Sequence, residues 1–370
     1  MYLPFPMIAH KCATLCCFLF CLLVAACSAE RGEQALENYQ SRLGNVFDDV
    51  DFPAKPEVIK GDLTAGFLSF GLPKQAIKAS PGHGDIARID LMDFLSLYGC
   101  RLQEVVARAN ASLGKLAPNS QRLISDLRFI ELAPECIDLL GEKDEPELAQ
   151  QLGKVLEFKR IELEASMARS IFEGPEYREF WKMPLALNDY PSADLSGESE
   201  RALMQLVGLR EAWLNGRVSE GRSDFESLLF QISTGDGGAL LKAYQLLLRK
   251  LNDLNALLNQ VLGARNLCEA VRPYSREILQ NVVQKFFVGD VQVWAAALNK
   301  RQYALQAALE ELEPGFESVL SDEYRSWAKQ RDALFSEARH AIKMHVQRVQ
   351  ILLNEDSLQS WCTERKLSPS

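Results

Sequence analysis

The chain has 370 residues, of which 47% are hydrophobic and 25% are charged, and its net charge is −9. This composition supplies enough apolar material for one large core or two smaller ones, so an intrinsically disordered chain is excluded. The acidic excess argues against a nucleic-acid-binding protein, because such proteins present a basic face to the phosphate backbone.

The first element along the chain is an export signal. Residues 12–27 form an apolar run behind Lys11, which ends in the small residues Val24-Ala25-Ala26 before Cys27. Within residues 1–26, the 15 residues that follow Lys11 carry no charge. This length matches a secretory apolar region of about 7–15 residues and falls short of the roughly 20 that a spanning helix needs. We therefore expect residues 1–26 to be a removed signal peptide. A permanent transmembrane anchor and secretion without lipid are the alternatives.

The end of this signal resembles the lipobox of bacterial lipoproteins. The resemblance implies that Cys27 becomes the first mature residue and carries acyl chains, with residues 27–32 as a lipidated tether. Each buried CH₂ adds roughly 0.8 kcal/mol of membrane affinity, so two or more chains anchor the protein permanently. Ser28 stands where inner-membrane lipoproteins typically carry Asp. The resemblance therefore implies the periplasmic face of the outer membrane, with the inner membrane as the alternative.

Four cysteines remain after removal of the signal. They are Cys100, Cys136, Cys268 and Cys362. An even number in an oxidising compartment predicts disulfides, for which three connectivities exist. We favour Cys100 with Cys136 and Cys268 with Cys362, because each pair lies within one half of the chain. No two of these cysteines are closer than 36 residues, so neither a metal site nor any other cofactor is predicted.

Residues 33–183 are predicted to form an N-terminal helical region. Residues 33–47 carry apolar side chains at helical spacing and predict an amphipathic helix. Residues 48–84 are rich in Pro and Gly, which predicts a long irregular segment. Further helical patterns cover residues 85–106, with an interruption at Tyr98-Gly99, then 120–132 and 145–172.

Residues 184–199, which are rich in Pro, Asp and Ser, are a candidate hinge before a C-terminal helical region at 200–370. Apolar residues between Gly238 and Gly263 alternate by three and four positions, as in a heptad seam. The seam covers fewer than three heptads, so we favour an intramolecular helix hairpin and a monomer over a dimer zipper. Helices at 291–312 and 321–353 complete three long amphipathic helices. The sequence thus predicts an all-α fold with an up-and-down bundle.

Histidines are few, and each one after the signal is a candidate for catalysis or metal binding. His83 lies in Gly82-His83-Gly84-Asp85 within the irregular segment and pairs an imidazole with a carboxylate, as a general base requires. Glu337 and His340 have the Glu-x-x-His spacing of helical di-iron proteins, but that chemistry needs the motif twice, so we expect a solvated pair. His345 lies on an apolar stripe and is expected at the edge of the core with one hydrogen bond.

One region resembles a known family. It comprises Ile89 to Glu104 (IDLMDFLSLYGCRLQE), then Arg108-Ala-Asn-Ala-Ser-Leu-Gly114 and Ser120-Gln-Arg-Leu123. This region is similar to the signature region of an uncharacterised family of Gram-negative bacterial lipoproteins, domain of unknown function 3080. The resemblance would cover nearly the whole mature chain. Because the family has no assigned activity, the resemblance implies a location and an extent but no reaction.

Arg108 and Asn110 belong to this region and precede Leu113-Gly114. We expect them to fix the turn by bonding helix-terminal carbonyl groups, because Arg donates in a rigid fork and Asn tolerates left-handed geometry. Contact with a ligand is the alternative role for both residues, and His83 is a third candidate for such contact.

The sequence thus predicts a lipid-anchored, helical periplasmic module without catalysis of its own. It is expected to bind an envelope protein or a wall component through a groove or an exposed helix face, with Phe67, Phe70 or Trp181 in the groove wall. The alternatives are a cell-envelope hydrolase that uses His83 and an unidentified nucleophile, and a structural spacer without a ligand.

Overall fold

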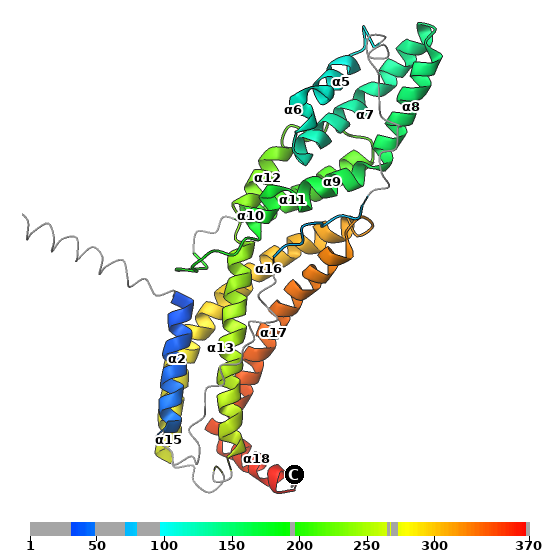
Figure 1. Cartoon of the computed structure of the whole chain (residues 1–370). Helices are drawn as coiled ribbons and strands as arrows, with labels where there is room; N and C mark the ends of the chain where they lie inside the picture. Colours follow the sequence, from blue (N-terminus) through cyan, green and yellow to red (C-terminus); the bar gives the residue numbers. More distant parts are fainter. Residues whose placement is uncertain are drawn as a thin grey trace, which may run out of the picture.

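The computed structural model describes residues 31–48, 71–79, 97–192, 197–264, 267 and 273–367. These residues form an elongated helical body (Figure 1). Within them there is no β-sheet, and the isolated β-bridge pairs Ile77 with Leu320. The predicted all-α fold is therefore confirmed. No helix in this part of the chain is long and apolar enough to cross a membrane.

One half of the body is a bundle of long helices. It contains α2 (Arg31–Asp48), α13 (Gly237–Gly263), α15 (Pro273–Val282), the π-helix η1 (Val283–Val291), α16 (Gln292–Gly315), α17 (Asp322–Leu353) and α18 (Glu355–Leu367). Helices α15, η1 and α16 follow one another without a gap and form one continuous helix.

The other half lies toward the top of Figure 1 and consists of shorter helices. It contains α5 (Leu102–Asn110), α6 (Ser112–Lys115), α7 (Asn119–Glu142), α8 (Pro146–Ile161), α9 (Leu163–Phe172), α10 (Pro175–Phe180), α11 (Glu198–Leu214) and α12 (Phe225–Ser233). Helix α7 packs against α5, α8 and α9, and α11 connects this half to α16.

Helix α13 is central to the bundle because its apolar seam is buried. The side chains repeat every three and four residues, which places them on one face. They are Tyr244, Leu247, Leu251, Leu254, Leu258 and Val261, and none is more than 2% exposed. The seam packs within the chain, mainly against α17.

Helices α13 and α17 run parallel to each other. Asn255 contacts Ala341, and farther toward the C-terminal end of both helices Asn259 contacts Arg348. Helix α16 runs back between the end of α15 and the start of α17 (Figure 1). The order α13, α16, α17 is therefore the predicted up-and-down arrangement. The seam packs mainly against the parallel helix α17, so the predicted packing within the chain holds but the predicted helix hairpin was wrong.

Two predicted helices have different bounds in the structure. The helix expected at 145–172 is divided at Glu162, whose φ of −81° and ψ of −3° end α8 and begin α9. The division is invisible in the apolar spacing because both helices pack against α7. The helix expected at 120–132 continues through Pro134 to Glu142. Helices α11, α12, α15, η1 and α18 were not predicted individually.

Contacts cross the candidate hinge at 184–199. Helix α2 precedes this segment in the chain and packs against η1, α15 and α13, which follow it. The segment is itself fixed at Tyr190, whose hydroxyl donates to Asp236 at 2.7 Å and whose carbonyl oxygen accepts from Trp294 at 2.9 Å. Residues 193–196 lie outside the described residues.

The disulfide predicted in the N-terminal half is present. Cys100 is bonded to Cys136, with 5.4 Å between the Cα atoms. It joins the turn before α5 to the middle of α7. Cys362 is also disulfide-bonded, and Cys268, its predicted partner, lies outside the described residues.

Part of the irregular segment crosses between the two halves of the body. Ala76 and Ile77 both donate their backbone N–H to Glu173 Oε1, at 2.9 and 3.0 Å. On the other side, the N–H of Ser321 donates to the Ala76 carbonyl oxygen at 2.8 Å. Residues 71–79 thus connect the end of α9 to the start of α17, and we call them the strap.

Candidate ligand-binding groove

A groove of about 680 Å³ lies between α13 and α17. Helix α13 contributes Leu248, Asn252, Asn255, Ala256 and Asn259. Helix α17 contributes Ser336, Glu337, His340, Ala341, Met344 and Arg348. Most of the side chains at the rim are polar, whereas the rest of the α13–α17 contact is apolar.

The helical repeat places these polar residues on one face. Asn252, Asn255 and Asn259 are three and four positions apart, so their side chains follow one another along α13. Asparagine is a weak helix former that is preferred at caps and turns. Three in the interior of one helix are therefore unfavourable for the helix alone and indicate a role in polar contacts.

A buried hydrogen-bond network extends into the core from Asn255, which lines the groove. The hydroxyl of Tyr39 on α2 lies 2.7 Å from Nε2 of His345. Nδ1 of His345 lies 3.1 Å from Oδ1 of Asn255, whose Nδ2 donates to the Ala341 carbonyl oxygen at 3.0 Å. This chain of contacts fixes the Asn255 side chain, whose Oδ1 and one amide hydrogen are both engaged within the protein.

Burial sets the protonation of this network. His345 is fully buried, and burial, with a smaller effect of Arg348, lowers its pKa to about 3. Burial also raises the pKa of Tyr39 well above its ordinary value. His345 is therefore neutral at physiological pH, with a proton on Nδ1 for Asn255 and a lone pair on Nε2 for the Tyr39 hydroxyl. The expected single hydrogen bond at the core edge is thus replaced by two in the interior.

Arg348 is half-buried, and its hydrogen bonding differs from that of the buried arginines Arg301 and Arg331. Its Nε donates to Asn259 Oδ1, but its buried Nη1 has no hydrogen-bond partner among the described residues. Within the same part of the chain, Arg348 is in no ion pair, and burial lowers its pKa. A buried donor without a partner costs about 1–3 kcal/mol, so this guanidinium is suited to an acceptor from outside the chain.

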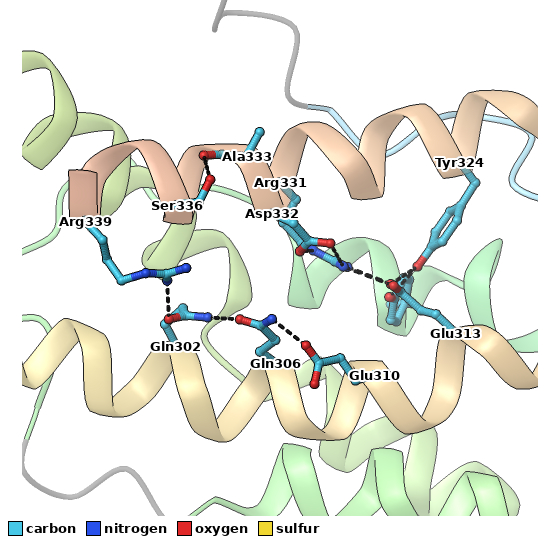
Figure 2. A network of polar contacts seen from close by, with 11 residues as sticks. Gln302, Gln306, Glu310, Glu313, Tyr324, Arg331, Asp332, Ala333, Ser336 and Arg339 are labelled. Carbon is cyan, nitrogen blue, oxygen red and sulfur yellow. Dashed lines mark hydrogen bonds and ion pairs between the residues drawn. The ribbon is translucent and has the colours of Figure 1, made fainter. Parts of the chain in front are cut away.

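Arg331 shows the opposite arrangement. Its Nη1 and Nη2 donate to Glu313 at 2.6 and 3.0 Å. Tyr324 also donates to Glu313, at 2.8 Å, and the guanidinium lies over the rings of Trp181 and Trp327. Figure 2 shows this cluster between α16 and α17. Its charges are satisfied internally, so it holds the two helices together.

The polar row beside that cluster is also internal. Figure 2 shows Gln302, Gln306 and Glu310 in succession along α16, with Arg339 of α17 donating to Gln302 at 2.9 Å. A third cluster pairs Arg301 with both Asp236 and Glu200. Arg210 and Arg276 also have a buried Nε without a partner among the described residues, but each is in an ion pair with a glutamate, whereas Arg348 is in none.

Glu337 and His340 both lie at the rim of the groove and are exposed. Their position agrees with the expected solvated pair. Within the described residues no group of three metal-ligating side chains exists. The pair therefore offers the groove one carboxylate and one imidazole as hydrogen-bonding groups.

The ligand contacts predicted from the sequence lie elsewhere. Arg108 is exposed on α5 and pairs with Glu104 at 2.6 Å, so it does not bond a terminal carbonyl. Arg122 does so instead, donating to the Lys115 carbonyl oxygen at 2.9 Å at the end of α6. Asn110 is exposed at the end of α5. The expected role in fixing the turn was therefore wrong for Arg108, and a ligand contact remains a prediction.

The remaining predicted residues fall into two groups. Those outside the described residues are Cys27, Phe67, Phe70, His83 and Cys268. Trp181 is described, is 3% exposed and packs against Trp327 with ring centroids 5.0 Å apart. It therefore belongs to the core, and its expected place in a groove wall was wrong.

Two places in the sequence have the Ser-x-x-Lys spacing of serine β-lactamases, Ser112 with Lys115 and Ser326 with Lys329. All four side chains are exposed, the first pair on the four-residue helix α6 and the second on α17. Neither lysine is therefore buried, as such a nucleophile needs for its activation. The motif gives no support to a hydrolase.

The chain matches the model of one protein family over most of its length. Residues 36–358 match the model of a family described as "Protein of unknown function (DUF3080)". The chain belongs to the DUF3080 family. The match confirms the DUF3080 part of the resemblance, and the groove of this DUF3080 protein lies inside the matched range. The Gram-negative lipoprotein part of the resemblance stays a prediction. No curated protein and no solved structure matches the chain.

Proposed function

We propose that this DUF3080 protein is a lipid-anchored, non-catalytic binding module, and that its groove holds an extended peptide with a free carboxylate. The observation that carries the proposal is Arg348, whose buried Nη1 has no hydrogen-bond partner in the described part of the chain. A carboxylate oxygen is the strongest acceptor for such a donor, because an arginine and a carboxylate match in geometry and in charge.

The spacing of charges along α17 favours an extended ligand. Glu337 and Arg348 are 11 residues apart, which corresponds to roughly 16 Å along a helix. An extended peptide of about five residues covers this distance. Its amino end would face Glu337 and its carboxylate would face Arg348.

The asparagines suit the backbone of such a ligand. Asn252 and Asn259 line the groove between its charged ends, and each amide offers both donors and an acceptor. A peptide backbone presents the same two kinds of group at every residue. Asn255 supports this surface from below, because its own amide is committed to His345 and Ala341.

The predicted location supplies a ligand of this chemistry. Lipidation of Cys27 and retention at the periplasmic face of the outer membrane would place the groove beside the cell wall. The short peptides of the wall carry free carboxylates and amino groups. We therefore choose a wall component as the partner and monomeric protein as the binding species.

The proposal is tested by titrating the full mature chain with a stem pentapeptide isolated from Gram-negative cell wall. We expect binding in a calorimeter, and we expect Arg348→Gln to weaken it at least tenfold, because a charged hydrogen bond contributes about 1.5–3 kcal/mol. Lys343→Gln is the matched control, since Lys343 is exposed on the same helix outside the groove.

Amidation of the peptide carboxylates should weaken binding as much as Arg348→Gln does. Equal affinity of the wild-type and Arg348→Gln proteins would contradict the proposal. An absence of binding would favour the structural spacer. Cleavage of the peptide would favour the hydrolase, whose predicted His83 lies outside the described residues.

A further inference from the structure

A second pocket lies where the described chain begins. It has a volume of about 300 Å³ and is formed by the start of α2, the segment around Tyr190 and the junction of η1 with α16. Figure 1 shows the start of α2 beside the segment between α10 and α11. Its lining includes the side chains of Arg31, Asp189, Asp290, Val293 and Trp294.

The walls of this pocket are fixed by close contacts. A Cβ atom at Gly32 would lie 2.1 Å from the ring of Trp294, so only glycine allows α2 to begin against this tryptophan. The Trp294 Nε1 donates to the Tyr190 carbonyl oxygen at 2.9 Å. The backbone N–H of Arg31 donates to the Asn188 carbonyl oxygen at 3.2 Å. Three segments far apart in sequence are therefore held together around the pocket.

The charges in the pocket do not neutralise one another. Arg31, Asp189 and Asp290 are all exposed, and none is in an ion pair with another described residue. One guanidinium and two carboxylates thus face one small volume. This arrangement is complementary to a molecule that carries an ammonium group and a phosphate group, because Arg binds phosphate in its fork and carboxylates accept from ammonium.

The sequence places this pocket close to the predicted lipid anchor. Arg31 follows Cys27 by four residues, and four extended residues span at most about 14 Å. Together the two headgroup layers of a bilayer add roughly 10–15 Å to its hydrocarbon core. A chain anchored through Cys27 therefore keeps this pocket near the headgroups. Val293, which is 59% exposed beside the pocket, adds an apolar contact.

We propose that this pocket binds the headgroup of a phospholipid that carries a primary ammonium and a phosphate, as phosphatidylethanolamine does. Asp189 and Asp290 would accept from the ammonium, and Arg31 would bind the phosphate. The mature chain, with 40 basic and 50 acidic side chains, is repelled by anionic lipid, which favours a zwitterionic headgroup. The inference rests on the lipid anchor of the proposed function and is independent of the peptide groove.

The test uses the full mature chain with Cys27→Ser, so that membrane binding does not depend on acylation. The protein is floated with vesicles of phosphatidylcholine, with or without half phosphatidylethanolamine. We expect at least fivefold more protein on the vesicles that contain phosphatidylethanolamine. Asp189→Asn with Asp290→Asn, or Arg31→Gln alone, should lower this to the level of phosphatidylcholine.

Matched controls keep the charge changes but move them away from the pocket. Glu323→Gln with Asp356→Asn replaces two exposed carboxylates, and Lys343→Gln replaces one exposed cation. Both proteins should float as the parent does. Arg348→Gln should also float normally, so that a failure of the peptide proposal is distinguishable from a failure of this one.

Soluble phosphoethanolamine distinguishes a membrane lipid from a free headgroup. Competition by millimolar phosphoethanolamine for flotation supports the proposal. Binding of phosphoethanolamine without any preference for vesicles that contain phosphatidylethanolamine would overturn it, as would equal flotation of the parent and the Asp189→Asn, Asp290→Asn protein. Mass spectrometry of the native amino terminus tests the anchor separately.

Discussion

His345 cannot take up a second proton without disturbing its neighbours. The proton would have to occupy Nε2, which accepts from the Tyr39 hydroxyl, and would charge an imidazole that solvent does not reach. This is why its pKa lies at about 3 in the folded protein. In the unfolded chain the same imidazole takes up a proton near pH 6.5. The unfolded state therefore binds one proton more at mildly acidic pH.

His345 therefore makes the free energy of unfolding depend on pH. Because the folded pKa is lowered, the contribution is complete above the unfolded pKa and is lost as pH falls. We expect the free energy of unfolding to fall by roughly 1 kcal/mol per pH unit between pH 6 and 4.5. Urea titrations across this range measure it. His345→Gln should flatten the slope, whereas His340→Gln should leave it unchanged, and an equal slope in all three proteins would refute the assignment.

Only some residues of the groove could be predicted from the sequence. The three asparagines at 252, 255 and 259 are visible as a polar row within an apolar helix. Their relation to Arg348 is not, because it depends on the parallel packing of two helices that a third helix separates in the chain. Arg108 and Asn110 were predicted as contacts from a family resemblance, and they lie at the other end of the body on α5.

Helix α2 depends on one glycine for its position. Gly32→Ala would drive a Cβ atom into the Trp294 ring, and we expect it to destabilise the protein by about 1–3 kcal/mol, as overpacking does. The control is Gly44→Ala on the same helix, where no atom lies within 4 Å of a new Cβ. That change should stabilise by about 0.5–1 kcal/mol. Urea unfolding compares the two, and equal effects would disprove the close contact.

Helix boundaries were predicted well where the chain carries a local signal. Helix α17 begins as expected after Ser321, whose hydroxyl oxygen accepts from the Tyr324 N–H at 3.1 Å. The continuous helix from α15 to α16 was recognised only from Val291 onward. Pro273 and Gly289 suggest interruptions, but the first lies at the helix start and the second is accommodated in the π-helix. The bundle around α2 was missed because it joins distant segments.

At the scale of the whole molecule, the strap connects the two halves of the body through Glu173. Its Oε1 accepts from two backbone N–H groups, and such charge-assisted bonds contribute about 1.5–3 kcal/mol each before solvent exposure reduces them. We expect Glu173→Ala to accelerate hydrogen exchange at Ala76 and Ile77 at least tenfold. Glu179→Ala, which removes an exposed carboxylate on α10, should not. Unchanged protection in Glu173→Ala would show that other contacts hold the strap.

Because α13 and α17 run in the same direction, both helices of the groove have their N-terminal ends on one side and their C-terminal ends on the other. Helix α2 runs in the same sense, since Tyr39 contacts His345 and Gly32 lies nearer the start of α2, against Trp294. The acidic end of the groove therefore lies toward the start of α2, which is the side of the proposed lipid anchor, and the arginine end lies away from it. A peptide bound in the proposed register would point its carboxyl terminus away from the lipid. The protein would therefore bind peptides in one orientation relative to the membrane plane.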